Sequence, residues 1–307
     1  MSMADRDGFI WLDGKMVPWR EANVHVLTHT LHYGMGVFEG VRAYETDKGP
    51  AIFRLQEHTD RLFNSAHIMQ MALPFSKDEI NQAQIASIKE NNLPHAYLRP
   101  MVFYGSEAMG LRATGLTVRV VVAAWEWPSY MAPEALEQGI KVRTSSFTRH
   151  HVNIAMCKAK ANGNYINSML ALNEALASGA DEALLLDPEG YVAEGSGENI
   201  FIVRDGVIYT PELTSCLDGI TRRSLIQIAE DQGYKVVEKR ITRDEVYVCD
   251  EAFFTGTAAE VTPIRELDGR KIGAGRRGPV TEKLQEVYFA AVRGQLPEYE
   301  HWLTYVN

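Results

Sequence analysis

Cysteine is scarce in this sequence. The 307 residues include only Cys157, Cys216 and Cys249, an odd number of cysteines placed far apart. Zinc sites and disulfide frameworks need closely spaced or paired cysteines, so this set predicts neither, and no metal site is expected. Because unpaired thiols are typical of reducing compartments, we expect reduced thiols in a cytoplasmic protein.

Long apolar runs and an excess of basic residues are also missing. The most apolar stretch, residues 118–125, has strand length and falls far short of the ~20 residues that a membrane helix needs. The N-terminus is charged and has no apolar segment, so no signal peptide is expected. With 31 basic and 40 acidic residues, the formal net charge is −9, which argues against nucleic acid or a membrane surface as a partner. We expect small-molecule ligands instead.

The length of the chain predicts about two domains of ordinary size. We expect a smaller N-terminal domain over 1–130, a linker over 131–138 and a larger C-terminal domain over 139–307. Apolar residues at helical spacing predict helices over 57–71, 77–91, 165–178, 220–232 and 279–292. Apolar runs predict strands that include 96–104, 116–125 and 140–145, with hairpins about Asp13-Gly14 and Asp205-Gly206. Hairpins mixed with helices favour an α+β (mixed α/β) fold over a doubly wound parallel sheet.

The most informative segment is a polar stretch with two lysines. It reads Lys158-Ala159-Lys160-Ala161-Asn162-Gly163-Asn164-Tyr165, and a predicted helix starts at Tyr165. A lysine beside a glycine and asparagine turn suits an amine that forms an imine, although a lone lysine is more often a solvated surface residue. Glu194, in a later turn, suits a partner for a pyridinium nitrogen. Together they indicate that a bound pyridoxal phosphate carries the chemistry, with either Lys158 or Lys160 as the reactive amine.

Two backbone segments are candidates for a phosphate site. Gly219-Ile220-Thr221-Arg222 opens a predicted helix, whose free N–H groups favour an anion. The alternative is an ordinary helix start, capped by Asp218 or Thr221. The segment 255–259 places two hydroxyls and a glycine after a buried strand, an arrangement that can present N–H groups to an anion.

Arg61 is a third candidate for the phosphate, because its helix is predicted to face the core. A guanidinium offers a fixed positive charge and the bidentate geometry that a phosphate favours. The alternative for Arg61 is a surface ion pair with Glu57 or Asp60 along the same helix.

Three other patterns do not predict function. Residues 273–278 match G-x-G-x-x-G, but no strand and βαβ unit surround them, so we reject a dinucleotide site. His25, His29 and His32 have helical spacing, yet no acidic residue stands between the first pair as a metallohydrolase would need. We therefore expect a structural role for these histidines. The sequence has no G-x-S-x-G nucleophile motif.

Taken together, the motifs resemble those of branched-chain amino acid aminotransferases, which are fold-type IV pyridoxal phosphate enzymes. The resemblance spans residues 8 to 305, and its specificity comes from several independent motifs in the right order. The segments that carry it are 32–42, 61–66, 97–100, 160–165, 194–199, 219–222 and 256–263. It implies the two-domain D-amino acid aminotransferase-like fold, with the cofactor in the cleft between the domains. The family's lysine stands five residues before the tyrosine, which selects Lys160, in the C-terminal domain, over Lys158.

The resemblance also implies roles for the cofactor-binding residues. Lys160 bonds to pyridoxal 5′-phosphate and moves the proton between Cα and C4′. Glu194 pairs with the pyridine nitrogen, and Tyr165 donates a hydrogen bond to the ring hydroxyl. Leu217 lies against the ring face, although Asp218 follows it where family members often have proline. The residues implied around the phosphate are Arg61, Gly219, Ile220, Thr221, Gly256 and Thr257.

The implied substrates are L-leucine, L-isoleucine or L-valine, which give their amino group to 2-oxoglutarate in a reversible ping-pong reaction. Arg99 accepts the side-chain carboxylate of glutamate, with a structural ion pair as its alternative. Tyr97 and the backbone at Thr257 and Ala258 take the α-carboxylate. Met109 and Leu111 reach in from a neighbouring subunit, so a homodimer or a hexamer is expected. Further substrate contacts are expected from Tyr33, Phe38, Gly40, Trp127, Tyr130 and Ala259.

Other activities remain open for such a sequence. A D-amino acid transaminase and aminodeoxychorismate lyase share the fold, and the segments 97–99 and 256–259 favour the branched-chain reaction over both. A non-catalytic small-molecule binding protein of the same fold is the alternative from another class. The presence of both Lys160 and Glu194 argues against a binding protein, because binding alone needs no imine.

Overall fold

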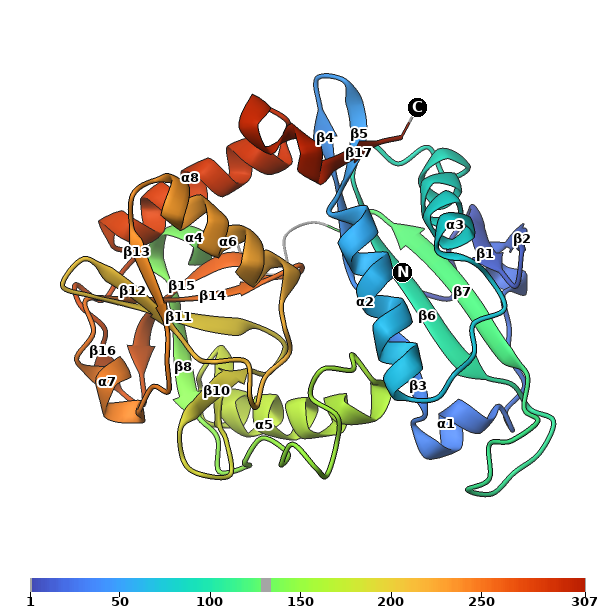
Figure 1. Ribbon diagram of the computed structural model, residues 1–307, viewed down its shortest axis with the longest axis horizontal. Helices are drawn as coiled ribbons and strands as arrows, with labels where there is room; N and C mark the ends of the chain where they lie inside the picture. The colour runs from blue at the N-terminus through green and yellow to red at the C-terminus, as the bar shows by residue number, and fades with distance from the viewer. Residues whose placement is uncertain (1, 128–133, 307) are drawn as a thin grey trace. The chain divides into compact units, whose positions relative to one another are not determined.

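The computed structural model describes residues 2–127 and 134–306 and divides into two compact units (Figure 1). The first unit comprises Met1–Pro128, Ala159–Gly163 and Ala291–Asn307, and the second comprises Ser129–Lys158 and Asn164–Ala290. The expected boundaries put 159–163 and 291–307 in the C-terminal domain, whereas both segments belong to the first compact unit. The domain boundaries themselves stay a prediction, and residues 131–133 of the expected linker lie outside the described residues.

The first unit is built on an eight-stranded antiparallel sheet. Its strand order is β17-β5-β4-β6-β7-β1-β2, with β3 also paired to β6. The final strand pairs with β5, so the C-terminal segment returns to the sheet that the N-terminal residues form. The strands are β1 (Phe9–Leu12), β2 (Lys15–Pro18), β3 (Gly36–Phe38), β4 (Val41–Thr46), β5 (Gly49–Phe53), β6 (Ala96–Tyr104), β7 (Val118–Trp125) and β17 (Leu303–Tyr305).

Two helices of the first unit, α2 (Leu55–Ile68) and α3 (Lys77–Lys89), pack on each other and on this sheet. Their apolar faces meet the sheet in one core, which includes Leu62, Ile80 and Val120. Burying such side chains contributes roughly 25 cal/mol per Å² of apolar surface. The short helix α1 (His29–Tyr33) lies at the end of β6, and two 3₁₀ helices complete the unit, η1 (Trp19–Glu21) and η3 (Pro297–Trp302).

The second unit is built on a nine-stranded mixed sheet. Its strand order is β10-β9-β8-β15-β14-β11-β12-β13, with β16 beside β15. The pairs β8–β9, β8–β15 and β12–β13 are parallel, and the other pairs are antiparallel. The strands are β8 (Ile140–Thr144), β9 (Glu182–Leu186), β10 (Val192–Gly195), β11 (Asn199–Arg204), β12 (Val207–Thr210), β13 (Lys235–Glu238), β14 (Glu251–Gly256), β15 (Glu260–Leu267) and β16 (Arg270–Lys271).

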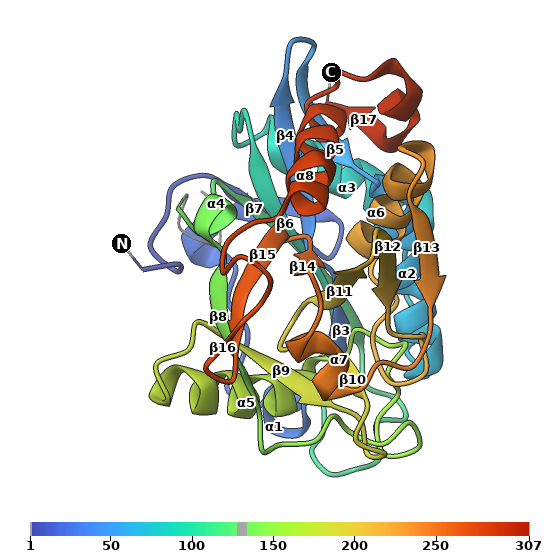
Figure 2. The same ribbon diagram turned by 90° about the vertical axis from the view of Figure 1, so that its left-hand side faces the viewer.

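Helices flank this second sheet. α5 (Tyr165–Ala177) lies beside β8 and β9, and α6 (Ile220–Asp231) packs on β13 and β14 (Figures 1 and 2). α4 (Ala135–Gln138) contacts β15, and α7 (Arg243–Tyr247) precedes β14. α8 (Pro279–Val292) starts in this unit, where the buried Glu251 carboxylate accepts the N–H groups of Val280 and Thr281. The 3₁₀ helix η2 (Asn162–Asn164) precedes α5.

Most of the predicted elements are confirmed. The five predicted helices correspond to α2, α3, α5, α6 and α8, with ends within a few residues, and both hairpins form. Asp13 and Gly14 have φ of 46° and 91°, as a type I′ turn requires. The central strand β15 was not predicted. It contains Pro263 and a register shift near Arg265, and these features hide the alternation that marks a strand.

Two composition-based expectations bear on the fold. Within the part of the chain that the structure describes, no helix has both the length and the apolar character needed to cross a membrane. The three cysteines are unpaired, and Cys216 and Cys249 are buried. Burial raises the pKa of both of these thiols to about 12, so they pack as small apolar side chains.

Candidate active site

Lys160 lies in the five-residue segment that belongs to the first unit. Its backbone N–H donates to the Ser65 hydroxyl of α2 (3.0 Å), and its carbonyl accepts the N–H of Phe38 (3.0 Å). Ala161 forms a bridge with Val37 of β3. These bonds fix the lysine backbone on both sides, while the side chain stays half-buried with its Nζ 5.1 Å from the centre of the Phe38 ring.

The Phe38 ring is shared with a second cation, Arg99 of β6. The Arg99 guanidinium carbon lies 4.7 Å from the ring centre, and its Nη2 donates to the Tyr97 hydroxyl (3.2 Å). The Arg99 Nε is buried and has no hydrogen-bond partner among the described residues. A buried donor of this kind favours an acceptor from a ligand. The structural ion pair considered for Arg99 does not form with any described carboxylate.

Aromatic rings extend this site along β6 and β7. Tyr97 meets Trp127 edge-on with ring centres 4.6 Å apart, and the Trp125 ring centre is 5.2 Å from that of Tyr97. A Cβ at Gly40 would stand 2.1 Å from the Tyr97 hydroxyl, so only glycine fits there. The predicted residues Phe38, Gly40, Tyr97, Arg99, Trp127 and Lys160 therefore form one group, which we call the lysine group.

Arg61 forms an ion pair with a buried carboxylate that was not predicted. Its Nε and Nη2 donate to the two oxygens of Glu39 at 2.7 and 2.9 Å, in bidentate geometry. His58 Nδ1 also bonds Glu39 (2.7 Å). Burial alone would raise the pKa of Glu39, but the charges and hydrogen bonds of Arg61 and His58 together outweigh burial, and the pKa lies well below its usual range. Burial lowers the pKa of His58, so Arg61 is the permanent cation of this cluster.

The alternative partners expected for Arg61 have partners of their own. Glu57 pairs with Arg54 (2.6 Å), and Asp60 pairs with Lys77 (2.7 Å). Arg61 is therefore held by the protein interior rather than by a surface pair. Its guanidinium is fixed in direction, as a phosphate ligand requires.

Tyr33, Met109 and Leu111 gather around Gly110 in the first unit. The Gly110 N–H donates to the Tyr33 hydroxyl at 3.1 Å. Leu111 is 90% exposed and Met109 44%, so both side chains project outward from the segment between β6 and β7. Tyr130, also predicted to bind substrate, lies outside the described residues.

Glu194 of β10 is buried in the second unit beside Arg149, a residue that was not predicted. Arg149 donates from Nε to Glu194 Oε1 at 2.8 Å, and its Nη2 lies 2.7 Å from the same oxygen. Nη1 bonds Asn167 and Ser168 in the first turn of α5, the helix that Tyr165 begins. Burial alone would lower the pKa of Arg149, but the charge of Glu194 together with the hydrogen bonds to it raises the pKa overall, so the guanidinium stays charged in the interior.

Glu194 is connected to the start of α6. Its Oε2 accepts the Leu217 N–H (3.1 Å), and Asn199 donates from its side chain to the Leu217 carbonyl (2.9 Å). Gly219 forms the N-cap and has no side-chain cap. A Cβ at Gly219 would lie 2.0 Å from the Asn199 Oδ1, which explains the glycine.

The start of α6 has the properties of an anion site. Asp218, the alternative cap, pairs with Arg223. Ile220 and Thr221 are buried in the first turn of this twelve-residue helix, and its N-cap residue, Gly219, supplies no side-chain cap. Backbone N–H groups at a helix start and the helix dipole favour a phosphate here.

The turn between β14 and β15 carries Gly256, Thr257, Ala258 and Ala259. A Cβ at Gly256 would make an ordinary contact with the Gly197 carbonyl oxygen, at 3.5 Å. The hydroxyl of the preceding Thr255 is buried and lacks a hydrogen-bond partner within the described part of the chain. Such a hydroxyl is available to a ligand at this turn.

Lys158, the alternative amine, is bound elsewhere. Its Nζ donates to the backbone carbonyls of Leu213 and Cys216, the latter at 3.0 Å, in the segment before Leu217. The side chain therefore braces a loop of the second unit, whereas Lys160 lies beside Phe38.

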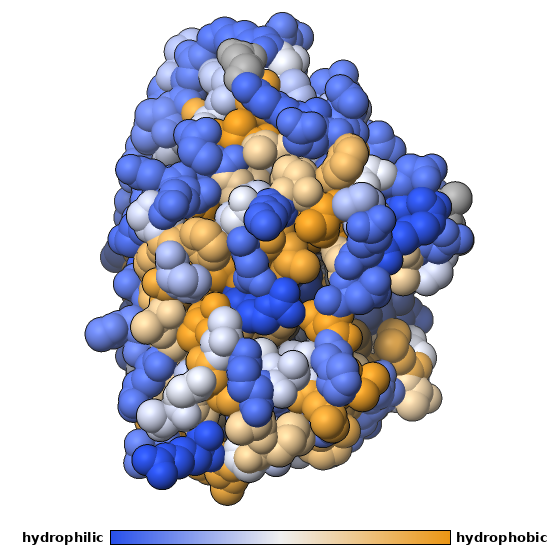
Figure 3. All heavy atoms as spheres, turned by 90° about the vertical axis from the view of Figure 1, so that its right-hand side faces the viewer, coloured by the Kyte–Doolittle hydropathy of each residue, from blue (hydrophilic) through white to orange (hydrophobic). Residues whose placement is uncertain are grey.

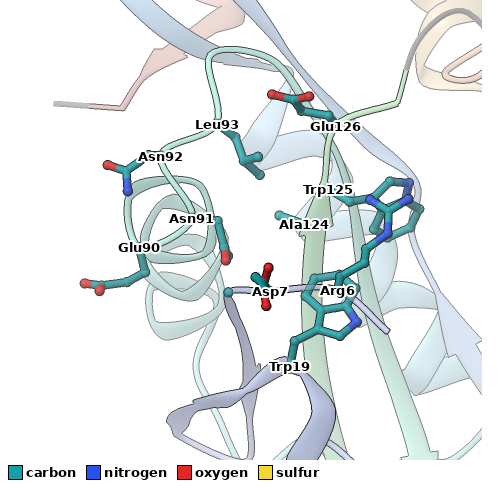
Figure 4. Close-up of a pocket in the computed structure, with 11 residues that line it drawn as sticks. Arg6, Asp7, Trp19, Glu90, Asn91, Asn92, Leu93, Ala124, Trp125 and Glu126 are labelled. Carbon is teal, nitrogen blue, oxygen red and sulfur yellow. The ribbon is translucent and has the colours of Figure 1, made fainter. Parts of the chain in front are cut away.

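Two further observations concern ligand sites. The three histidines do not form a metal cluster, and no group of three or more His, Cys, Asp or Glu suited to a metal occurs among the described residues. A cavity of about 580 Å³ lies beside Trp125 and contains none of the predicted site residues (Figure 4). Asn91, Leu93 and Ala124 surround its middle, while Glu90 and Asn92 point away from it.

Arg149, Glu39 and Asn199 are the residues that sequence reasoning missed. Glu39 and Asn199 stand inside segments that carry the resemblance, so each could have been found by asking which cation or carbonyl it serves. Arg149 offered no such signal, since its partner Glu194 lies 45 residues away in sequence.

Comparison with known proteins identifies the family. Residues 36–267 match the sequence pattern of the family described as "Amino-transferase class IV". The chain is also 72% identical to the branched-chain-amino-acid aminotransferase of Pseudomonas aeruginosa over 307 residues, 100% of both chains. The chain belongs to the class IV aminotransferase family.

Solved structures place this class IV aminotransferase among the branched-chain members. Two structures of the T.th. branched-chain amino acid aminotransferase each give a TM-score of 0.95 at 53% identity, covering 98% of this chain and 99% of that chain. One is complexed with N-(5′-phosphopyridoxyl)-L-glutamate and the other with 4-methylvaleric acid. The predicted fold and the resemblance to branched-chain aminotransferases are thus confirmed.

We predict that replacing Arg149 by Met destabilises the protein, because the buried Glu194 charge loses its cation. Breaking a buried pair costs about 3 kcal/mol or more in the free energy of unfolding. Urea denaturation measures this loss. Arg149→Met combined with Glu194→Gln should regain much of it, because the two effects are coupled.

A matched control for this prediction is Arg204→Met. Arg204 pairs with Asp250 at 3.2 Å in the same unit, but the Arg204 side chain is 49% exposed. Exposed pairs contribute about 0–1 kcal/mol, so this variant should unfold close to the unmodified protein. Equal losses of unfolding free energy in Arg149→Met and Arg204→Met would show that the buried pair stabilises the protein no more than an exposed pair.

Proposed function

We propose that this chain transfers the amino group of L-leucine, L-isoleucine or L-valine to 2-oxoglutarate, with pyridoxal 5′-phosphate as cofactor. The reaction is a reversible ping-pong transamination that yields the branched-chain 2-oxo acid and L-glutamate. The observation that carries the proposal is the lysine group, in which one apolar ring, Phe38, lies between the amine of Lys160 and the guanidinium of Arg99. This arrangement supplies a reactive amine, an apolar surface and a carboxylate partner at one place.

The residues present fit the cofactor. A phosphate needs fixed donors, and the uncapped start of α6 and the guanidinium of Arg61 supply them. A protonated pyridine nitrogen needs a stable anion, and Glu194 is buried beside Arg149. The relative complexed with N-(5′-phosphopyridoxyl)-L-glutamate supports the same cofactor here.

Pyridoxal phosphate, when bound, supplies a ring that withdraws electrons from the Cα of the amino acid. Lys160 would hold the cofactor through its amine and would move a proton between the substrate Cα and the cofactor C4′. The fixed backbone of Lys160 would restrict where that proton is taken and returned. Tyr165 would donate to the ring hydroxyl, and Glu194 would keep the ring nitrogen protonated.

The phosphate and ring contacts follow from the second unit and from Arg61. We assign the phosphate to Arg61, Gly219, Ile220, Thr221, Gly256 and Thr257. Leu217 would lie against the ring face, and its backbone N–H bond to Glu194 fixes its position. Asn199 fixes the same loop through the Leu217 carbonyl.

One site must accept both leucine-like and glutamate-like side chains. Arg99 binds the distal carboxylate of glutamate, and its unpartnered Nε supports this role. The apolar wall that a branched side chain contacts is assigned to Tyr33, Phe38, Trp127 and Tyr130. Tyr97 and the backbone at Thr257 and Ala258 take the α-carboxylate, with Gly40 and Ala259 as further substrate contacts. A relative that binds 4-methylvaleric acid, a branched aliphatic acid, supports an apolar wall of this kind.

We further propose at least a homodimer, with a hexamer as the alternative, in the cytoplasm. In this arrangement Met109 and Leu111 complete the substrate site of the neighbouring subunit. Around α1, the first unit exposes Val26 (74%), Leu31 (65%) and Leu111 (90%), and apolar atoms gather in the lower part of the face in Figure 3. Sedimentation should give at least twice the mass of one chain, and cell fractionation should place it in the soluble fraction. A monomer would contradict the assembly.

The proposed reaction is tested by absorption spectroscopy. Purified protein should carry a visible band from the bound cofactor. L-leucine or L-glutamate added alone should remove that band, because each donates its amino group in a half-reaction, and D-alanine should leave it unchanged. A colourless protein that takes up no pyridoxal phosphate would contradict the proposal, and loss of the band with D-alanine alone would favour D-amino acid transamination.

The choice between the two lysines is tested by paired substitutions. Lys160→Ala should reduce turnover by several orders of magnitude, because the amine that moves the proton is lost. Lys158→Ala removes only hydrogen bonds to backbone carbonyls, so this variant should retain measurable turnover with leucine and 2-oxoglutarate. Steady-state rates decide, and equal losses in the two variants would contradict the assignment of Lys160.

A further inference from the structure

The short helix α1 is anchored firmly to the end of β6. The His29 N–H donates to the Gly105 carbonyl (2.8 Å), and the Thr30 hydroxyl accepts the Tyr104 N–H (2.8 Å). His29 is 2% exposed, and its ring lies against Tyr33 (4.5 Å between ring centres) and Tyr104 (5.9 Å). The His29 ring therefore has a fixed position and direction.

One residue of the β6–β7 connection is bound to this helix at both of its backbone polar groups. His29 Nε2 lies 2.7 Å from the Gly110 carbonyl oxygen, and the Gly110 N–H donates to the Tyr33 hydroxyl (3.1 Å). His29 and Tyr33 are four residues apart, so they share a face of α1. Gly110 has φ of +106°, a backbone conformation that favours glycine.

The direction of the histidine bond follows from its acceptor. A carbonyl oxygen only accepts, so His29 Nε2 carries the hydrogen and donates it. His29 Nδ1 is buried and lacks a hydrogen-bond partner among the described residues. The bond to Gly110 is thus the one hydrogen bond that the structure records for this buried ring, and it is made to a segment without helix or strand.

We propose that His29 is a positioning residue that sets side-chain selectivity, by clamping Gly110 and so fixing Met109 and Leu111 on either side of it. This inference rests on the proposed function, in which those two side chains contact the substrate. Met109 and Leu111 are exposed in the single chain and have little packing of their own. Their placement therefore depends on the Gly110 backbone, and His29 holds its carbonyl.

The test compares selectivity between leucine and valine, which differ by one methylene. His29→Phe keeps a ring but removes the donor, and should change the ratio of kcat/KM for leucine over valine by about tenfold. His29→Gln keeps an N–H donor and should restore the ratio to within about twofold. His32→Phe is the matched control, since His32 Nε2 bonds the Val26 carbonyl (2.8 Å) outside the clamped segment, and its ratio should not change.

One variant keeps the inference falsifiable if His29→Phe fails to fold. Leu111→Ala alters a side chain that is 90% exposed, so it should fold and should shift the same ratio. If His29→Phe folds, hydrogen exchange of residues 106–113 should be faster in it than in His29→Gln and in His32→Phe. A merely structural role would reduce both substrates equally.

The outcomes separate the inference from the proposed function. If the unmodified protein fails to transaminate leucine and valine, the proposed function is wrong. If it does so, an unchanged ratio in Leu111→Ala, or equal loss on both substrates in His29→Phe, overturns the role of His29. The role of His29 is supported if the ratio of kcat/KM for leucine over valine changes in His29→Phe, recovers in His29→Gln and stays unchanged in His32→Phe.

Discussion

The interaction on which the rest depends is the pairing of a buried carboxylate with a fixed cation. Each compact unit pairs a predicted site residue with a partner that was not predicted, Arg61 with Glu39 and Glu194 with Arg149. Removing two charges from water costs several kcal/mol per ion, which only close geometry and further hydrogen bonds offset. The pairs therefore need further polar partners. Arg149 donates to Asn167 and Ser168, and Glu194 accepts the Leu217 N–H.

These two pairs serve different chemical needs. Under the proposed function, the member of the first pair that binds the cofactor is the cation, and the buried Glu39 directs the Arg61 guanidinium through two parallel bonds. In the second pair it is the anion, and Arg149 supplies a positive charge beside the buried Glu194. A phosphate and a ring nitrogen have opposite charges, so the protein uses the same pair with the roles exchanged.

Close backbone approach is the second constraint, and glycine satisfies it at particular positions. Gly40 leaves room for the Tyr97 hydroxyl, and Gly219 leaves room for the Asn199 side chain. In each case the neighbouring polar group bonds a site residue, Arg99 or Leu217. At these two positions, glycine leaves space for a polar side chain from a neighbouring strand.

The sequence by itself determined the family and the main helices and hairpins, and it proposed Lys160 as the reactive amine, because periodicity and short motifs are local properties of the chain. It also indicated Arg61 and the start of α6 as anion donors. Only the tertiary structure decided that Arg61 pairs with Glu39 rather than with Glu57 or Asp60, that Arg149 accompanies Glu194, and that His29 bonds Gly110. Each of these contacts joins residues far apart in sequence, and a local pattern carries no information about which distant partner satisfies a buried charge or donor.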